Sequence, residues 1–387
     1  MSYIINYLEP VKRTWNSIYG ISHDESLGGN TIFFDGAEET VCNTSAETVI
    51  IGVAEDRNSS ENRFCSKSPN IIRELLYGLR LIKGQRLLDA GNVRGITVND
   101  RYRALQEVAE FFLKSGKTLI VLGGTQDLTI PLYNALETVK KNVIVTVCDS
   151  MIDFDISGKD FSSRAWINSF TGNNKPPDDL TIMGIQNYLV SESLENEIKN
   201  NFFEILRLSE IRGNNLKKAE VPLRDSDLFS FDQRAVVGKF AFGEKIASPH
   251  GLEPYEACKI CQYAGLSDKL SVMGIFEVTS ETKLYGFNNE ALAAQMVWHF
   301  MEGVSERYAD CPSTENLNYK NYSAFLETSR KEIQFFNNET NGRWWMETPS
   351  QDGKNKIVSC NYEDYVKALE NEFPEKWWRL FMKNNSV

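Results

Sequence analysis

Three aspartates stand directly after two strongly apolar segments of the chain. Asp149 and Asp153 follow the run VIVTV at 143–147, and Asp232 closes the segment LFSFD at 228–232. Carboxylates that a fold brings together need a cation, a proton or an arginine to balance their charge. An aspartate after a strand can also cap the helix that follows it. The spacing therefore leaves two interpretations open, a charged site and ordinary helix caps.

Two further apolar segments end in residues that can do chemistry. TLIVL at 118–122 runs into Gly123-Gly124-Thr125-Gln126-Asp127, where the glycine pair lets the backbone turn sharply into a helix. Neither GxGxxG nor a Walker pattern surrounds this pair, so a nucleotide loop is poorly supported. The last apolar segment ends at Phe276-Glu277-Val278, which places a fourth carboxylate directly after a strand.

The elements that must position these residues alternate along the chain between strand and helix patterns. Continuous apolar runs such as VIIGV suit strands that are covered on both faces. Alternation of this kind predicts a three-layer α/β/α fold with a mostly parallel, doubly wound sheet of about eight strands, whose functional residues gather at the carboxyl ends of the strands. We expect strands at Thr48–Val53, Arg86–Asp89, Thr118–Leu122, Asn142–Val147, Leu180–Ile185, Glu204–Leu208, Leu228–Asp232 and Ser271–Thr279, and helices at Pro69–Arg80, Arg101–Ser115, Thr129–Lys140, Glu253–Ala264 and Glu290–Tyr308.

The α/β pattern covers residues 47–308 and leaves both ends of the chain outside it. Residues 1–46 form a polar N-terminal lead-in, and residues 309–387 form an aromatic-rich C-terminal extension. The pairs Trp344-Trp345 and Trp377-Trp378 suit either an exposed recognition surface or anchors that dock the extension. The one-sided spacing of Phe373, Trp377 and Phe381 favours an extension that packs on the domain.

Composition narrows the classes of function. The net charge is −11 and no dense cluster of Lys and Arg is present, which argues against nucleic acid as a partner. No apolar run reaches the length of a membrane span, so we expect no membrane insertion. Seven cysteines, an odd number, and the lack of a secretory pattern at the N-terminus predict reduced thiols and a cytoplasmic protein. Cys258 and Cys261 form a CxxC in a helical segment without partner ligands, which favours buried structural thiols.

In this order and at these strand ends, the motifs resemble those of the ureohydrolase family of arginase, agmatinase and formimidoylglutamase. Its GGDHS, DAHxD and SxDxD motifs correspond to 123–127, 149–153 and 230–234, and its EVNP-like segment corresponds to 277–280. Ser68–Arg73 resembles the family's GPxxIR, Asp89–Val93 its DxGD, and Met183–Gln186 its IGIR strand. The resemblance spans about residues 48–308. It implies an arginase-like fold and, in the family, two manganese ions that activate a hydroxide for attack on a guanidine or formimino carbon.

The same resemblance shows that half of the family's metal ligands are replaced. Gln126 and Met151 stand in place of the two ligand histidines, and Arg234 stands in place of one ligand aspartate. One remnant site, formed by Gln126, Asp149, Asp153 and Asp232, keeps only oxygen donors and allows one Mn²⁺ or Mg²⁺ ion. The other site would need Met151 and Arg234 as ligands, which does not suit a hard cation. We therefore expect no cofactor, or at most a single divalent ion.

Arg234 and Glu277 are expected to reshape what remains of the site. The planar guanidinium of Arg234 could bridge Asp149 and Asp232 in the place of the lost ion, or it could point to solvent from its loop. Glu277, which in the family contacts the substrate, could bind a cationic ligand or pair with Arg234. Of the three histidines only His250 lies in a loop that could approach the site, and the segment Ile156–Ser169 contains none.

Two functions are compatible with this sequence. The first is a divergent, non-catalytic protein of the ureohydrolase fold that binds or scaffolds an unknown protein partner. The alternative is a formimidoylglutamase-like C–N hydrolase of a guanidino or formimino compound that uses one metal ion or an altered site. Relatives in the family form oligomers, and the sequence allows this here as well.

Overall fold

The apolar strand segments pair into one large sheet. The structure is a computed structural model and describes residues 3–15, 19–59, 62, 64–158, 161–171, 176–238, 249–280, 288–310, 312, 319–327, 329–350 and 355–385. Within these residues the sheet has ten strands in the order β1-β4-β3-β5-β10-β9-β6-β7-β8, and β2 pairs with β4. The strands are β1 (Leu8–Glu9), β2 (Ile32–Phe33), β3 (Thr48–Gly52), β4 (Leu87–Val93), β5 (Thr118–Leu122), β6 (Ile144–Cys148), β7 (Asp179–Ile185), β8 (Glu204–Arg207), β9 (Leu228–Asp232) and β10 (Val272–Phe276).

All eight predicted strands are present as β3 to β10, and they pair in parallel throughout. The predicted mostly parallel sheet is thus confirmed, with two differences. The lead-in adds the short strands β1 and β2, and β1 runs antiparallel to β4. The last strand ends at Phe276 and not at Thr279, because Glu277 adopts a positive φ of 56° that a strand cannot continue.

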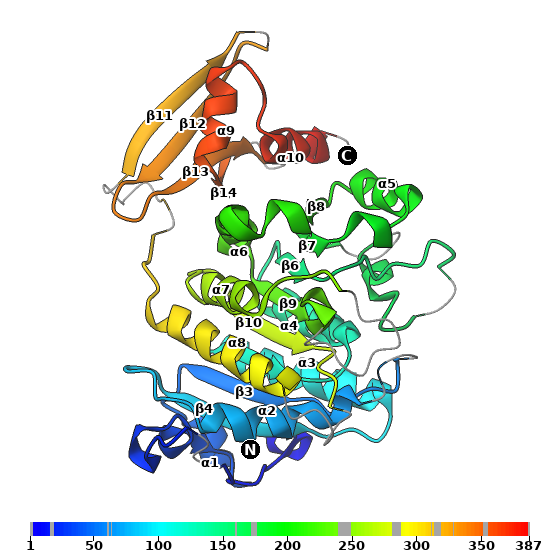
Figure 1. Ribbon diagram of the computed structural model, residues 1–387, viewed down its shortest axis with the longest axis vertical. Coiled ribbons are helices and arrows are strands. Elements are labelled where there is room, and N and C mark those ends of the chain that lie inside the picture. Colours follow the sequence, from blue (N-terminus) through cyan, green and yellow to red (C-terminus); the bar gives the residue numbers. More distant parts are fainter. Residues whose placement is uncertain are drawn as a thin grey trace.

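Helices cover both faces of this sheet and complete the predicted three layers (Figure 1). Successive residues of a strand point to opposite faces. Ile120 therefore packs in one apolar cluster with α2, α7 and α8, whereas Leu119 and Val121 pack in a second cluster with α3 and α4. The helices are α1 (Glu38–Cys42), α2 (Ser68–Tyr77), α3 (Val98–Lys114), α4 (Thr129–Val139), α5 (Glu192–Asn200), α6 (Glu220–Asp225), α7 (Pro254–Gly265) and α8 (Asn288–Ser305). Among the described residues, none of the helices has the length and apolarity that crossing a membrane requires.

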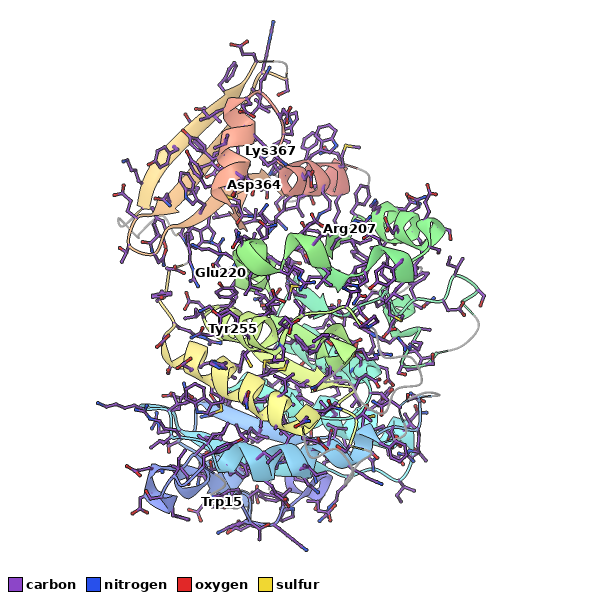
Figure 2. The ribbon with its side chains drawn as sticks, viewed as in Figure 1. Trp15, Arg207, Glu220, Tyr255, Asp364 and Lys367 are labelled. Carbon is purple, nitrogen blue, oxygen red and sulfur yellow. The ribbon has the colours of Figure 1, made fainter. Side chains whose placement is uncertain are left out.

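The C-terminal residues form a small unit with a sheet and an apolar core of its own. Its antiparallel strands β11 (Tyr319–Leu326), β12 (Lys331–Asn338), β13 (Arg343–Pro349) and β14 (Asn355–Cys360) lie side by side in that order. The helices α9 (Tyr362–Leu369) and α10 (Glu375–Asn385) pack on this sheet, and the rings of Phe373, Trp377 and Phe381 stack in a row. The first ring pair has centroids 4.8 Å apart. Figure 2 shows Asp364 and Lys367 of this unit at the opposite end of the molecule from Trp15.

Buried ion pairs attach the C-terminal unit to the amino ends of the strands. Arg379 on α10 donates to Asp179, the first residue of β7, over 3.0 Å and to Glu204, the first residue of β8, over 3.3 Å. Lys376 donates to Asp225, the last residue of α6, over 2.8 Å. Because these acceptors lie at the amino ends of β7 and β8 or just before β9 begins, the unit leaves the carboxyl ends of the strands uncovered.

We predict that Lys376→Met lowers the free energy of unfolding at pH 7 by about 3 kcal/mol, because the buried carboxylate of Asp225 loses the nearer of its two lysine partners. Burial raises the pKa of Asp225, but the charges of Lys376 and Lys269 more than reverse this and hold the pKa below its ordinary value. The pair therefore stabilises the fold above about pH 4, and this stabilisation is lost as the pH falls further. Urea denaturation at pH 7 and pH 3 should show that the difference between variant and wild type shrinks in acid.

The control is Lys367→Met, which removes a surface pair 3.8 Å long with Glu375, whose side chain is 93% exposed. This variant should stay within about 0.5 kcal/mol of the wild type. Equal losses in both variants would show that the ion pair with Asp225 does not hold the unit in place.

Candidate functional site

The predicted site residues come from four neighbouring strands in the middle of the sheet. Gln126 follows β5, Glu277 follows β10, Asp232 ends β9 and Asp149 follows β6. Since β5, β10, β9 and β6 are adjacent and parallel, their carboxyl ends meet at one edge. The structure thus brings together the residues that the motifs single out.

The glycine pair after β5 allows the backbone to turn sharply and to pack closely against neighbouring residues at this edge. Gly123 and Gly124 both have a φ of 79°, a conformation that other residues rarely adopt. A Cβ on Gly124 would lie 2.3 Å from Leu128 Cδ1 and 3.0 Å from the carbonyl oxygen of Val53. The pair therefore lets the chain turn into a short 3₁₀ segment, Gln126–Leu128, that holds Gln126 against the other strand ends.

Asp149, Asp153 and Asp232 form a compact buried triad. Each offers one carboxylate oxygen, and these oxygens lie within 4.8 Å of one another. The three residues are between 0% and 1% exposed. Carboxylates in so dry a place need compensation by opposite charge or by protons. Their spacing would suit one metal ion.

Arg234 lies within this triad. Its Nε donates to Asp232 Oδ1 over 2.9 Å, and its Nη2 donates to Asp153 Oδ2 over 3.1 Å. The distance from Nη2 to Asp149 Oδ2 is 3.8 Å, an ion pair without a hydrogen bond. Arg234 is only 7% exposed, so the guanidinium is buried and does not point to solvent. The hypothesis of a bridge between Asp149 and Asp232 needs one change, because Asp153 takes the second hydrogen bond.

A second arginine, which the sequence analysis missed, reaches the same site. Arg164 contacts the sulfur of Met151 and lies 3.6 Å from Asp153 Oδ1, with 26% of its side chain exposed. It belongs to the segment Ile156–Ser169, in which a histidine, and not an arginine, was the expected signal. Arg164 is the single arginine among residues 149–178, the stretch that begins with Asp149 and Asp153.

Gln126 faces the triad as a donor. The side-chain amide is oriented so that both its nitrogen and its oxygen have hydrogen-bond partners. Its nitrogen then donates to Asp149 Oδ2 over 3.2 Å and to Asp153 Oδ2 over 3.3 Å, and its oxygen accepts from Ser230 Oγ. In this orientation the carboxylates receive hydrogen bonds, and the amide oxygen points away from the place where an ion would lie. In this orientation Gln126 helps to neutralise the acidic oxygens.

Glu277 is buried beside the triad in a strained backbone conformation. Its carboxylate accepts from the backbone nitrogen of Gln126 over 3.3 Å and from Asn62 Nδ2 over 3.1 Å. Burial raises the pKa of Glu277 to about 8; Arg234 opposes this shift, and Asp232 and Asp153 add to it. Glu277 is therefore mainly protonated at neutral pH.

The triad itself also favours protonation. Burial, followed by the charges of Asp232 and Asp153, raises the pKa of Asp149 well above its ordinary value. Burial likewise raises the pKa of Asp153, although Arg234 and Arg164 oppose it. Bound protons and the two guanidinium groups thus share the task of balancing charge at this edge.

The residues present do not fit a two-metal centre. The two positions that resemble the family's histidines carry an amide and a thioether, and Arg234 brings a positive charge to the place of a ligand carboxylate. Three carboxylates remain close enough to hold one ion, but the guanidinium already uses the oxygens of Asp232 and Asp153. A dication would have to displace it.

The other residues singled out by the sequence lie elsewhere. His250 is exposed in a surface hollow at the ends of β7 and β8, where its carbonyl oxygen accepts from Gln186 Nε2 over 2.9 Å. Cys258 and Cys261 are buried on α7, and burial raises the pKa of the Cys258 thiol to about 12. Arg73 and Asp89, from two secondary motifs, meet in a buried pair 2.9 Å long that fixes α2 to β4.

The sheet order and the carboxylate edge define an α/β protein of the arginase fold. Solved structures with this fold include Trypanosoma cruzi formiminoglutamase with Mn²⁺, which is 23% identical with a TM-score of 0.60 and matches 68% of this chain and 95% of its own. Formimidoylglutamase from Bacillus subtilis matches at 18% identity with a TM-score of 0.60, over 68% of this chain and 89% of its own. Agmatine ureohydrolase of Thermoplasma volcanium matches at 21% identity with a TM-score of 0.55, over 67% of this chain and 90% of its own.

Sequence comparison leads to the same family. The arginase family model matches residues 46–302. A formimidoylglutamase from Staphylococcus haemolyticus is 25% identical over 280 residues, which cover 68% of this chain and 89% of the relative. The chain therefore belongs to the arginase family, as the resemblance in its motifs implied.

We predict that Arg234→Met lowers the free energy of unfolding by about 3–5 kcal/mol, because it leaves the buried triad without its cation. The loss should grow between pH 5 and pH 8 as the carboxylates give up their protons. Chemical denaturation at both pH values measures it, with the exposed Arg94→Met as the matched control. Similar stabilities for the two variants would mean that Arg234 does not balance the triad.

Glu277→Gln should change the pH dependence of stability. The folded-state pKa of about 8 lies above the ordinary value of 4.5, so the contribution of Glu277 is full below pH 4.5 and is lost as the pH rises to about 8. We therefore predict that the variant becomes more stable relative to the wild type between pH 5 and pH 9. Denaturation of both proteins across this range tests the prediction, and a difference independent of pH would contradict it.

Proposed function

We propose that this chain is a non-catalytic member of the arginase family, with a binding or scaffolding role, in which guanidinium groups replace the metal centre. The observation that carries the proposal is the buried contact of Arg234 with Asp232 and Asp153. The same contact supports the proposal that the protein holds no resident metal.

Charge at the carboxyl edge supports this proposal. The acidic groups are the triad, Glu277 and the buried Asp127, and the cations among the described residues of the site are Arg234 and Arg164. The raised pKa values of Asp149 and Glu277 supply the rest of the balance as protons. A dication entering this edge would meet two fixed positive charges, which weaken the attraction that the carboxylates exert on it.

The groups at this edge are also poorly suited to activate a water molecule for hydrolysis. Metal ions make a strong nucleophile at neutral pH by lowering the pKa of bound water. A guanidinium can donate hydrogen bonds but does not bind water as a Lewis acid, and Glu277 in its protonated form is no base. The groups at this edge therefore suit a static network better than the activation of water.

The alternative is a formimidoylglutamase-like C–N hydrolase of a guanidino or formimino compound, with one Mn²⁺ or Mg²⁺ at Gln126, Asp149, Asp153 and Asp232. Two observations favour it, the spacing of the triad oxygens within 4.8 Å and the formimidoylglutamases among the relatives. It requires Arg234 to leave the triad and Gln126 to turn its oxygen inwards, two rearrangements that the first proposal does not need.

A binding role leaves the partner to be identified by experiment, and it allows self-association. We also propose a cytoplasmic location, in support of which the six cysteines among the described residues are all free, at Cys42, Cys65, Cys148, Cys258, Cys261 and Cys360. Cys311 lies outside the described residues.

The deciding measurement is metal content by mass spectrometry after preparation with excess Mn²⁺, together with assays for release of urea and formamide. We predict well below one equivalent of Mn²⁺ and no turnover. One ion per chain with turnover would establish the alternative, and two ions would overturn the assignment of Arg234.

A reconstructed centre serves as the control. The triple variant Gln126→His, Met151→His and Arg234→Asp restores the residue types of the family's motifs and should bind Mn²⁺ under the same conditions. Gain of metal by this variant and not by the wild type would show that the three replacements exclude the ions. If the variant folds and binds none, the replacements are not what prevents binding.

A further inference from the structure

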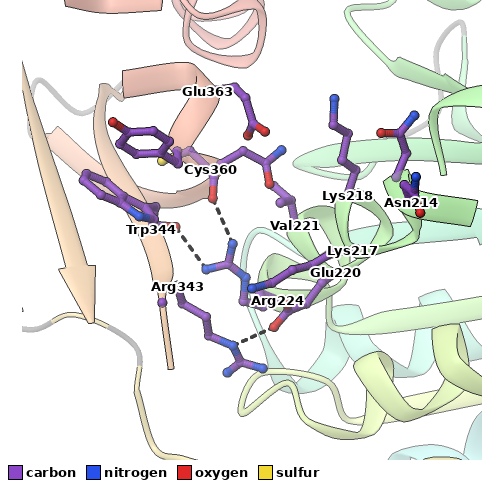
Figure 3. A pocket seen from close by; sticks show the side chains of 14 residues that line it. Asn214, Lys217, Lys218, Glu220, Val221, Arg224, Arg343, Trp344, Cys360 and Glu363 are labelled. Atoms are coloured by element: carbon purple, nitrogen blue, oxygen red, sulfur yellow. Dashed lines mark hydrogen bonds and ion pairs between the residues drawn. The ribbon is translucent and has the colours of Figure 1, made fainter. Parts of the chain in front are cut away.

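A cavity of about 280 Å³ lies between the α/β domain and the C-terminal unit (Figure 3). Lys217, Lys218 and Arg224 line it from the domain, and Arg343, Trp344 and Tyr362 line it from the C-terminal unit. One water molecule occupies about 30 Å³ in the liquid, so the cavity can hold a small molecule but not a folded segment. It shares no lining residue with the carboxylate edge.

Arg224 is a buried cation held by neutral groups. Its Nη1 donates to the carbonyl oxygen of Trp344 over 3.0 Å and its Nη2 to that of Cys360 over 2.9 Å, the contacts drawn in Figure 3. Its guanidinium lies 4.8 Å from the centre of the Trp345 ring. The residue is 7% exposed, and its Nε is buried without a hydrogen-bond partner. Within the described chain no carboxylate forms an ion pair with it, so its charge is left without a direct counter-ion.

The acidic groups near Arg224 have other partners. Glu220 accepts from Arg343 over 2.6 Å, and Asp225 accepts from Lys376 over 2.8 Å. Figure 2 places Glu220 at the boundary between the two parts of the molecule. Both carboxylates are thereby neutralised by a cation from the C-terminal unit.

The lining of the cavity carries excess positive charge. It contains four cations, Lys217, Lys218, Arg224 and Arg343, and two carboxylates, Glu220 and Glu363. Asp310 lies just outside the lining and pairs with Arg343 over 3.0 Å, so one positive charge remains in excess. The whole chain has a net charge of −11, so this cavity has the opposite sign to the molecule. Clefts lined by one sign of charge concentrate ligands of the opposite sign.

We propose that this cavity binds a small polyanion, a molecule with several phosphate or carboxylate oxygens. The ammonium groups of Lys217 and Lys218 supply hydrogen-bond donors at the open side of the cavity. The buried positive charge of Arg224 attracts the anion from the wall of the cavity. Because the two walls belong to different parts of the chain, the bound anion joins the domain and the C-terminal unit. The inference does not rest on the proposed function.

The test is calorimetric titration of the full chain at low ionic strength with inorganic pyrophosphate and, separately, with citrate. We expect saturable binding of one molecule per chain for at least one anion, weakened by added salt. Lys217→Ala with Lys218→Ala should lower the affinity by about tenfold or more, since two charged hydrogen-bond donors are removed. Both lysines are exposed, so this variant keeps the fold.

The matched control is Lys12→Ala with Lys83→Ala, which removes two exposed lysines outside the cavity. It should bind as the wild type does. Binding of pyrophosphate alone points to a phosphate ester as the ligand, and binding of citrate alone points to a polycarboxylate; either supports the proposal. Absence of saturable binding by both anions, or equal weakening by the two double variants, would overturn it.

Discussion

Like charges held in a dry interior impose the main constraint on this molecule. The parallel sheet places Asp149, Asp153 and Asp232 at one edge, almost fully buried, where their repulsion is poorly screened. A fold with this edge is stable only if something brings positive charge or protons to the carboxylates. In the present chain the cations come from its own side chains, Arg234 and Arg164. The amide of Gln126, the contact of Arg164 with Met151 and the protonated state of Glu277 can all be understood as parts of that balance.

The two edges of the sheet show that burial alone does not decide the protonation of a carboxylate. At the amino ends, Asp179 and Asp225 are buried, yet nearby cations hold their pKa values below the ordinary range. At the carboxyl ends, Asp149 and Glu277 are equally buried, but neighbouring carboxylates add to the effect of burial and their pKa values rise. The difference lies in the number of cations per carboxylate. At the amino edge, ion pairs attach the C-terminal unit to the domain. At the carboxyl edge, the raised pKa values favour protonated carboxyl groups.

Much of this architecture could be predicted from sequence because its signals are local. Continuous apolar runs identify β3 to β10, and the rule that parallel strands present their carboxyl ends together predicts the meeting of Gln126 with the aspartates and Glu277. Strands of two residues such as β1 and β2 leave too short a pattern to detect. Arg164 and the choice of Asp153 as a partner for Arg234 depend on how loops fold back over the edge, which residue types do not specify. The separate sheet of the C-terminal residues was not predicted, although the buried Ile333 and Phe335 of β12 alternate with more exposed residues as in a half-buried strand.

A cation carried by the chain behaves differently from one that is bound. An ion stabilises a protein by mass action, so its contribution depends on the free concentration of the metal and disappears when a chelator or a competing protein removes it. Arg234 is separated from Asp232 by a single residue, and its supply is fixed once the chain is made. Under the proposed function, the stability of this edge would not depend on the concentration of any free metal ion.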